Sequence, residues 1–291
     1  MAGDLPKRIT AEVVAAQGGG PPVAVATVIS APPDGAVPVG AKLLIRADGT
    51  TLGVLDGGPL EAAVRAEAAD AFRRHGVDAV YLDAGGARLS RQQAEGRPSY
   101  QVMLEVHERP ATLLISGGGH ISKALATIGH LCGFAVAVVD DRPDYANQER
   151  FPEAVQVLCG DFARTLRDIP IDANTYVVCV TRGHKHDEIS LREVVARDAA
   201  YVGMIGSRRR VSAVLQHLIE EGYDPEAIAR VHSPIGLDIG AETPEEIAVA
   251  IMAEIVQVRR GGSGRPMREV KRARRGVAPA ERVPPEGEGG S

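Results

Sequence analysis

Three consecutive glycines at 117–119 are the residues of this chain best suited to approach a phosphate. They follow an apolar run at 113–116 and precede a segment with the apolar spacing of a helix. Glycine permits a tight turn, and the first turn of the following helix offers free N–H groups and a positive dipole end. Ser122 stands at the third glycine position of G-x-G-x-x-G, where a small residue still permits close packing of helix on strand. The predicted contacts with a nucleotide-like ligand in this segment are Gly117, Gly118, Gly119, His120 and Ser122.

A second apolar run, 136–139, ends in Asp140, which lies 23 residues after Gly117. An acid at about this distance from the glycines binds ribose hydroxyls in nucleotide-binding βαβ units. We therefore predict that Asp140 contacts a ribose-like hydroxyl or a ring donor, and that Asp141 and Arg142 extend this contact. For a dinucleotide, the acid would favour NAD over NADP. The alternative is a Rossmann-like turn that holds no ligand.

Polar and cationic residues follow the apolar run 176–180, in the sequence TRGHKHDE. Such groups at the carboxyl end of a strand suit anion binding or proton transfer. Two histidines separated by one residue are not a complete metal site, so we predict no metal here. The alternative is a simple loop in which Asp187 begins the next helix. The predicted ligand contacts of this segment are Thr181, His184, Lys185 and His186.

A third polar segment begins at Gly206 and Ser207, which end another apolar run. Ser207 can begin a helix whose first turn carries Arg208, Arg209 and Arg210. Cations at a helix N-terminus oppose the helix dipole, so a bound anion would compensate them. We predict that Ser207 and Arg208, with Arg209 as the alternative arginine, bind a phosphate or carboxylate.

An α/β fold would bring the three polar segments described above together at one edge of a sheet. Apolar runs near 112–116, 134–139, 155–158, 176–180 and 201–205 alternate with helical patterns near 120–132, 161–167, 187–197 and 208–221. This alternation predicts a Rossmann-like, doubly wound parallel sheet, with the polar segments along its carboxyl edge. We expect this domain at 108–260, preceded by a small α+β domain at 1–107 and followed by a disordered tail at 261–291. A helix start at 243–246 combines an N-cap threonine, a first-turn proline and a glutamate three residues after the cap.

Composition excludes several classes of protein. The 291 residues include 3% aromatic residues and no Trp, and the net charge is −5, which argues against a nucleic-acid-binding surface. No apolar run has the length of a membrane span and the N-terminus lacks a signal-peptide core, so we expect a cytoplasmic protein without a membrane partner. The three cysteines lie in or beside apolar segments, and we expect buried thiols without disulfides: Cys132, Cys159 and Cys179.

The sequence resembles the XdhC/CoxI family, the maturation factors of xanthine dehydrogenase and related molybdenum hydroxylases. The resemblance rests on GGGHISKAL (117–125), VVDDRPDYANQERFP (138–152), TRGHKHDE (181–188), YVGMIGSRRR (201–210) and the segment 233–261. It implies binding of the molybdenum cofactor (molybdopterin), protection of the cofactor during sulfuration, and delivery to an apo molybdenum hydroxylase of the xanthine dehydrogenase type. It also implies a homodimer and a cysteine desulfurase as a further partner.

The N-terminal part resembles the family less closely, through residues 39–64. Pro59 stands where family members often carry a cysteine, and the loop 31–39 lacks the Gly-Ser-Ala-Pro-Arg run of many members. This departure puts a thiol-dependent cofactor contact in doubt.

Two other functions remain open from the residues alone. One is an NAD(P)-dependent oxidoreductase, with His184 or His186 as acid or base and Lys185 polarising a carbonyl. The other is a nucleotide-binding interaction module without catalysis. The sequence offers no complete catalytic set, which favours a non-catalytic maturation factor.

Overall fold

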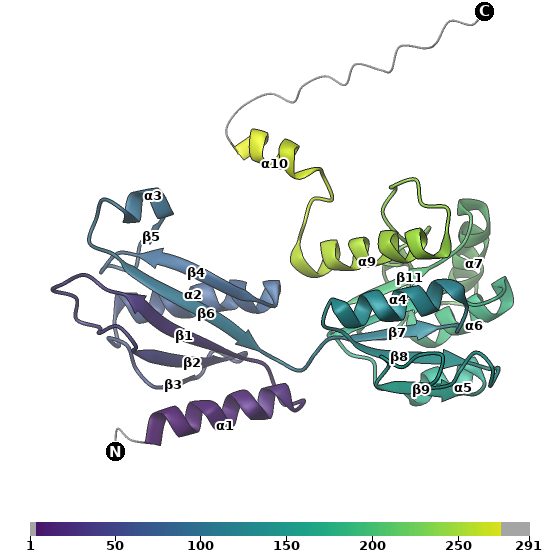
Figure 1. Ribbon diagram of the computed structural model, residues 1–291, viewed down its shortest axis with the longest axis horizontal. Helices are drawn as coiled ribbons and strands as arrows, with labels where there is room; N and C mark the ends of the chain where they lie inside the picture. Colours follow the sequence, from purple (N-terminus) through teal and green to yellow (C-terminus); the bar gives the residue numbers. More distant parts are fainter. Residues whose placement is uncertain (1–3, 275–291) are drawn as a thin grey trace, which may run out of the picture.

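The computed structural model describes residues 4–274 and contains two β-sheets, each covered by helices (Figure 1). The N-terminal sheet is antiparallel, with strand order β3-β2-β1-β6-β4-β5. Its strands are β1 (Val23–Ser30), β2 (Lys42–Arg46), β3 (Thr51–Leu52), β4 (Val77–Leu82), β5 (Arg88–Leu89) and β6 (Tyr100–His107).

Helices on both faces explain why β1 is apolar along most of its length. Ala24, Ala26 and Val28 pack with helix α2 (Pro59–Arg74) on one face of the sheet. Val23 and Val25 point to the other face and pack with helix α1 (Leu5–Gln17). Successive side chains of a strand alternate between faces, so a strand covered on both faces reads as a continuous apolar run. The expected small α+β domain is therefore present.

The second sheet has five parallel strands in the order β11-β10-β7-β8-β9. Counted along the chain from β7, this is the doubly wound order in which the first strand lies at the centre, and it confirms the predicted Rossmann fold. The strand order reverses between β7 and β10, and ligands of such folds bind at that point, outside the carboxyl ends of the strands. The strands are β7 (Thr112–Ser116), β8 (Ala135–Asp140), β9 (Gln156–Cys159), β10 (Thr175–Cys179) and β11 (Tyr201–Met204).

Helices cover both faces of this parallel sheet. Ile115 faces α4 and α9, and Leu114 on the same strand faces α5, α6 and α7. Gly129 brings α4 close to β7, because a Cβ at this position would overlap the Leu113 side chain. The helices are α4 (His120–Leu131), α5 (Phe162–Asp168), α6 (His184–Val194), α7 (Arg208–Glu220), α8 (Pro225–Ala229) and α9 (Pro244–Arg260).

Helix α9 begins as predicted. The Thr243 hydroxyl accepts a hydrogen bond from Glu246 N–H, and the Glu246 carboxylate accepts one from Thr243 N–H. Pro244 occupies the first turn, where its missing N–H costs nothing. This capping box fixes the start of the helix that packs beside α4 on one face of the parallel sheet.

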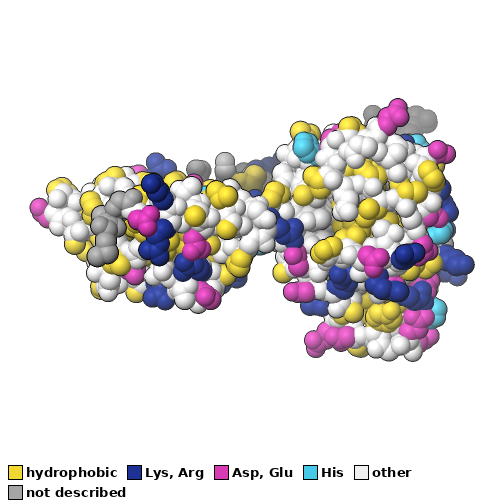
Figure 2. Space-filling view, turned by 90° about the horizontal axis from the view of Figure 1, so that it is seen from below, with side chains coloured by type: hydrophobic (Ala, Val, Ile, Leu, Met, Phe, Trp, Pro, Cys, Tyr) yellow, Lys and Arg dark blue, Asp and Glu magenta, His cyan; other side chains and the backbone are white. Residues whose placement is uncertain are grey.

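The two sheets meet at a narrow junction, visible in the space-filling view (Figure 2). Glu108, between β6 and β7, lies 3.0 Å from His75 Nδ1 at the end of α2 and 3.5 Å from Arg259 Nη2 at the end of α9. The Arg259 guanidinium also lies 5.0 Å from the centre of the Phe134 ring. The junction therefore holds the amino edge of the parallel sheet, and its carboxyl edge points away from the N-terminal sheet (Figure 1).

Several elements differ from the sequence-based predictions. Helix α6 begins at His184, three residues before the expected start near Asp187. The short helices α3 (Arg91–Ala94) and α8 were not predicted. Helix α10 (Met267–Arg274) lies in the tail that was expected to be disordered, whereas 275–291, like 1–3, is outside the described residues. We retain 1–107 and 108–260 as a proposed division of the chain.

No helix within residues 4–274 is both long and apolar enough to cross a membrane.

Candidate functional site at the carboxyl edge of the parallel sheet

Gly117 leaves β7 through a backbone conformation that requires glycine. Its φ is +109°, and a Cβ here would lie 2.5 Å from the Val180 carbonyl oxygen. Its N–H donates to the Val139 carbonyl at 2.7 Å. The chain thus passes between the ends of β8 and β10, at the point where the strand order reverses.

The next two glycines serve different purposes. A Cβ on Gly118 would overlap the Tyr145 carbonyl, so protein atoms already fill the space beside Gly118. A Cβ on Gly119 would meet no protein atom within 4 Å, and its φ of −69° suits any residue. Gly119 is the N-cap of α4 and has no side chain to satisfy the first-turn N–H groups. The open space at a helix N-terminus is where an anionic ligand can approach the backbone.

Asp140 holds this loop in place from the end of β8. Its side chain is 1% exposed and accepts hydrogen bonds from Gly118 N–H (2.8 Å), Arg142 N–H (3.0 Å), Arg142 Nε (2.9 Å) and Arg142 Nη2 (3.0 Å). Burial alone would raise the pKa of Asp140, but the bonds from Arg142 and Gly118 outweigh burial and hold the pKa below its usual value. Both carboxylate oxygens are occupied, so the predicted contact with a ribose-like hydroxyl would require Arg142 to move.

Two arginines that the sequence analysis did not select lie at the same loop. Arg150 Nε donates to the Gly118 carbonyl at 2.9 Å, while its buried Nη2 has no hydrogen-bond partner among the described residues. Arg182 donates two hydrogen bonds to Asp141, at 2.8 and 3.0 Å. Because β7 lies between β8 and β10, the Arg182–Asp141 ion pair spans the end of β7. A strand order known in advance would have indicated this pairing.

The segment after β10 is organised by Asp187. This buried carboxylate accepts hydrogen bonds from Thr181 N–H (2.8 Å) and Thr181 Oγ1 (2.6 Å). Asp187 therefore fixes the turn into α6 from the first helical turn, and it is not the helix start that we expected. Lys185 is exposed on that first turn, whereas the half-buried His186 ring lies 5.4 Å from the Phe162 ring. Lys185 is thus free to meet an anion.

The other predicted ligand contacts include Ser122 in α4 and Ser207 and Arg208 at the start of α7. The Ser122 hydroxyl is buried and has no hydrogen-bond partner among the described residues. Ser207 is the N-cap of α7 but makes no side-chain cap bond, and Arg208 beside it is exposed. Strand β10 separates β11, and therefore this segment, from β7. Their contact with a ligand stays a prediction.

Possible metal ligands are grouped elsewhere in the described structure. Glu188, His217 and Glu221 place ligand atoms within 4.8 Å of one another between α6 and α7. Arg192 Nη2 donates to Glu188 and Glu221, at 2.6 Å in both cases. A guanidinium already neutralises both carboxylates, so this group is an ion-pair network.

The expectation of three buried thiols was wrong for two of them. Cys179 is buried, whereas Cys132 and Cys159 are exposed. Burial raises the pKa of the Cys179 thiol, with a smaller contribution from the Asp187 carboxylate. Cys159 ends the edge strand β9 and is the register partner of Asp140. Apolar neighbours in sequence failed to indicate burial because β9 has a neighbouring strand on one side only.

These contacts make the loop sensitive to the charge of Asp140. A carboxylate with a lowered pKa stabilises the fold above its unfolded pKa of about 3.9, and this contribution is lost as pH falls through the folded value. We expect Asp140→Asn to lower the free energy of unfolding at pH 7 by about 1–3 kcal/mol, because it removes charge-assisted hydrogen bonds. Urea unfolding at pH 7 and pH 3 measures this, and the difference from wild type should shrink at pH 3. Asp144→Asn, at an exposed aspartate of the same loop, is the control; equal losses in both variants at pH 7 would contradict the assigned role.

The chain is similar to several known proteins. YqeB, an uncharacterized protein of Escherichia coli, is 34% identical over 237 residues, covering 77% of this chain and 41% of that protein. A Bacillus subtilis protein named as a probable xanthine dehydrogenase component is 33% identical over 148 residues, covering 51% of this chain and 43% of the relative. PaoD of E. coli, named a molybdenum cofactor insertion chaperone, is 24% identical over 274 residues, covering 76% and 79%. The matches thus span about two fifths of the first two relatives.

A solved structure supports the fold. The crystal structure of a xanthine dehydrogenase from Bacillus halodurans has a TM-score of 0.51 and 21% identity, covering 86% of this chain and 95% of that chain. The XdhC Rossmann domain matches residues 113–255, and the XdhC and CoxI family matches residues 15–81. These two matches together cover more than half of the sequence and include parts of both sheets. The chain belongs to the XdhC/CoxI family.

Proposed function

We propose that this chain is a maturation factor that holds the molybdenum cofactor and delivers it to a molybdenum hydroxylase of the xanthine dehydrogenase type. Membership of the XdhC/CoxI family and the name of the relative PaoD support this role. The cofactor would bind at the glycine-loop site, which comprises residues 117–122, 140–142 and 181–187. An apo-hydroxylase, a cysteine desulfurase and a second copy of the chain would be its partners.

The observation that carries the proposal is the open position at Gly119. It lies at the N-terminus of α4, where free N–H groups and the helix dipole favour the phosphate of a pterin cofactor. Arg182 and Lys185 bring positive charge to the same edge, from the segment after β10. The site therefore combines backbone donors with cations, which suits binding of an anion.

The Arg182–Asp141 ion pair suits a site that must both bind and release its cargo. Its side chains are 43% and 28% exposed, and such pairs contribute about 0–1 kcal/mol. A ligand phosphate could exchange with Asp141 for the Arg182 guanidinium at little cost. Because the carboxyl edge points away from the N-terminal sheet, a hydroxylase could approach the bound cofactor from that end.

An NAD(P)-dependent oxidoreductase is the second candidate, and the strand order favours it. Dinucleotides bind at this reversal point in doubly wound sheets. Two observations weigh against it: Asp140 is committed to Arg142, and the His186 ring packs near Phe162. A dehydrogenase would need that acid free for the ribose and a group ready to transfer a proton.

The first test of the proposed site replaces Gly119 with valine. The side chain would occupy the open space at the start of α4, so we expect the affinity for molybdopterin to fall more than about tenfold, or about 1.4 kcal/mol. Molybdopterin released from a purified molybdenum enzyme is titrated anaerobically, with binding followed by pterin fluorescence.

Gly96→Val is the matched control, since a Cβ there also meets no protein atom within 4 Å. Gly96 lies in the N-terminal sheet domain, so this variant should bind as wild type does. Unchanged affinity in a folded Gly119→Val protein would show that the ligand binds elsewhere.

The second test separates the maturation factor from the oxidoreductase. We expect no oxidation of NADH or NADPH with small carbonyl compounds, and we expect Lys185→Ala to impair activation of an apo-hydroxylase. Loss of one charge-assisted contact should weaken cofactor binding by about 1.5–3 kcal/mol. The measurements are the absorbance of the reduced nicotinamide and the activity of the reconstituted hydroxylase. Steady hydride transfer that Lys185→Ala abolishes would establish the oxidoreductase instead.

A further inference from the structure

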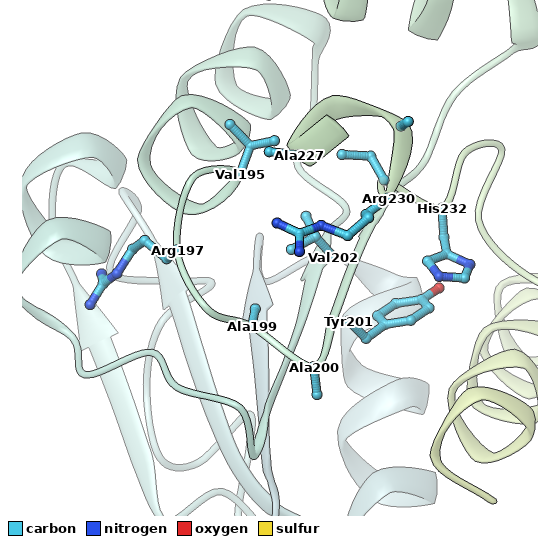
Figure 3. Close-up of a pocket in the computed structure, with 11 residues that line it drawn as sticks. Val195, Arg197, Ala199, Ala200, Tyr201, Val202, Ala227, Arg230 and His232 are labelled. Carbon is cyan, nitrogen blue, oxygen red and sulfur yellow. The ribbon is translucent and has the colours of Figure 1, made fainter. Parts of the chain in front are cut away.

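A cavity of about 300 Å³ lies at the amino end of β11 (Figure 3). Because β11, β10 and β7 are parallel, this end lies at the opposite edge of the sheet from the glycine loop, which follows the carboxyl end of β7. Small side chains form much of its lining, among them Ala199, Ala200 and Ala227, together with Val202. Most pockets that bind small molecules are apolar with a few polar groups, and this volume is at their lower limit. The cavity therefore has room for a compact ligand with an apolar body.

Two arginines border this cavity, and only one is available to a ligand. Arg197 donates to the carbonyl oxygens of Leu166 (2.9 Å) and Ile169 (2.8 Å), and it points away from the other lining residues in Figure 3. The Arg230 guanidinium lies over Val202 in the middle of that view. Within the part of the chain that the structure describes, the Arg230 side chain has no hydrogen-bond or ion-pair partner.

His232 forms the third part of the lining, and its ring is held in a fixed orientation. It stacks on the Tyr201 ring with 4.4 Å between centroids, and its Nδ1 lies 3.4 Å from Glu254 Oε1. Tyr201 in turn donates to Glu254 Oε2 at 2.6 Å. The His232 side chain remains 32% exposed. A preorganised ring beside an apolar lining favours a planar ligand over a flexible one.

We propose that this cavity binds a small aromatic carboxylate. The planar Arg230 guanidinium matches a carboxylate with two parallel hydrogen bonds, and the apolar lining receives the ring. A free phosphate fits less well, since it would bring more charge and no apolar surface to the same single arginine. The ligand is distinct from the cargo of the glycine-loop site, because Ala199 and Ala200 precede β11 at the amino edge of the sheet, whereas residues 117–122 and 181–187 follow β7 and β10 at its carboxyl edge.

The Glu254 carboxylate links this cavity to the loop that precedes α9. Its Oε2 also accepts a hydrogen bond from Gly236 N–H at 2.9 Å. Gly236 belongs to the glycine-rich segment 233–242, which runs from His232 to the start of α9. A ligand in contact with His232 would therefore touch a side chain that Glu254 links to this loop.

Calorimetric titration of the full chain with benzoate at constant ionic strength tests the proposal. We expect saturable binding with a dissociation constant of about 1 mM or tighter. Arg230→Gln should weaken it at least about tenfold, because the carboxylate loses its charged partner. Arg97→Gln is the control, at an exposed arginine in the N-terminal sheet domain, and should leave it unchanged. Neutral benzamide should bind wild type no better than benzoate binds Arg230→Gln.

A second variant fills the cavity while Arg230 remains. Ala199→Leu should abolish benzoate binding because the added side chain occupies the space of the ring. Absence of benzoate binding to the folded wild type would overturn the proposal. Equal affinity of wild type and Arg230→Gln would overturn it as well, since the arginine would then have no part in recognition.

Discussion

The buried Asp140 carboxylate is the interaction on which the glycine-loop site depends. One side chain joins the ends of two neighbouring strands, because it receives the Gly118 N–H from the segment after β7 and Arg142 from the segment after β8. A buried carboxylate is costly unless it is paired and hydrogen-bonded, and here both oxygens are. The hydrogen bonds that stabilise the Asp140 carboxylate also fix Gly118 against the Tyr145 carbonyl. The space at Gly119 remains open. The site is therefore preorganised before any ligand arrives.

This arrangement changes the meaning of the acid that follows the glycines. In a dinucleotide-binding unit such an acid is free to accept ribose hydroxyls. Here Arg142 occupies it and stacks on the Tyr145 ring, with 3.6 Å between the guanidinium carbon and the ring centre. The acid organises the loop, and the exposed cations Arg182 and Lys185 would remain for the proposed ligand. Glycine spacing alone does not distinguish these two uses of the same position.

Alternating apolar runs predicted the parallel sheet, and the residue types at 243–246 predicted the N-cap of α9, since both depend on residues near one another in the chain. The Arg182–Asp141 pair could not be predicted in this way, because its partners are 41 residues apart and meet only through the strand order. The start of α6 was placed too late because Asp187 looked like a cap. Its carboxylate instead reaches back to Thr181, a contact that depends on the turn and not on residue type. The exposure of Cys159 follows from the position of β9 at a sheet edge, which is also a property of the whole fold.

Pro59 lies far from the glycine-loop site. Pro59 begins α2, a 16-residue helix about 24 Å long, and the other end of α2 meets the junction at His75. The glycine loop lies beyond the junction, at the far end of β7. A cavity of about 370 Å³ beside Pro59, lined by Asp56, Leu60 and residues 32–37, is thus too far to share one small ligand with Gly119 of the same chain. Pro59 therefore makes no contact with the residues proposed for the glycine-loop site.

Hydrogen–deuterium exchange with and without molybdopterin tests whether the cofactor binds at the glycine loop, because it locates the ligand without altering a residue. We expect slower exchange in peptides that cover 116–123, 140–146 and 181–187, and unchanged exchange in 31–39 and 55–61. Protection confined to 31–39 and 55–61 would instead place the cofactor in the N-terminal sheet domain and contradict binding at the glycine loop.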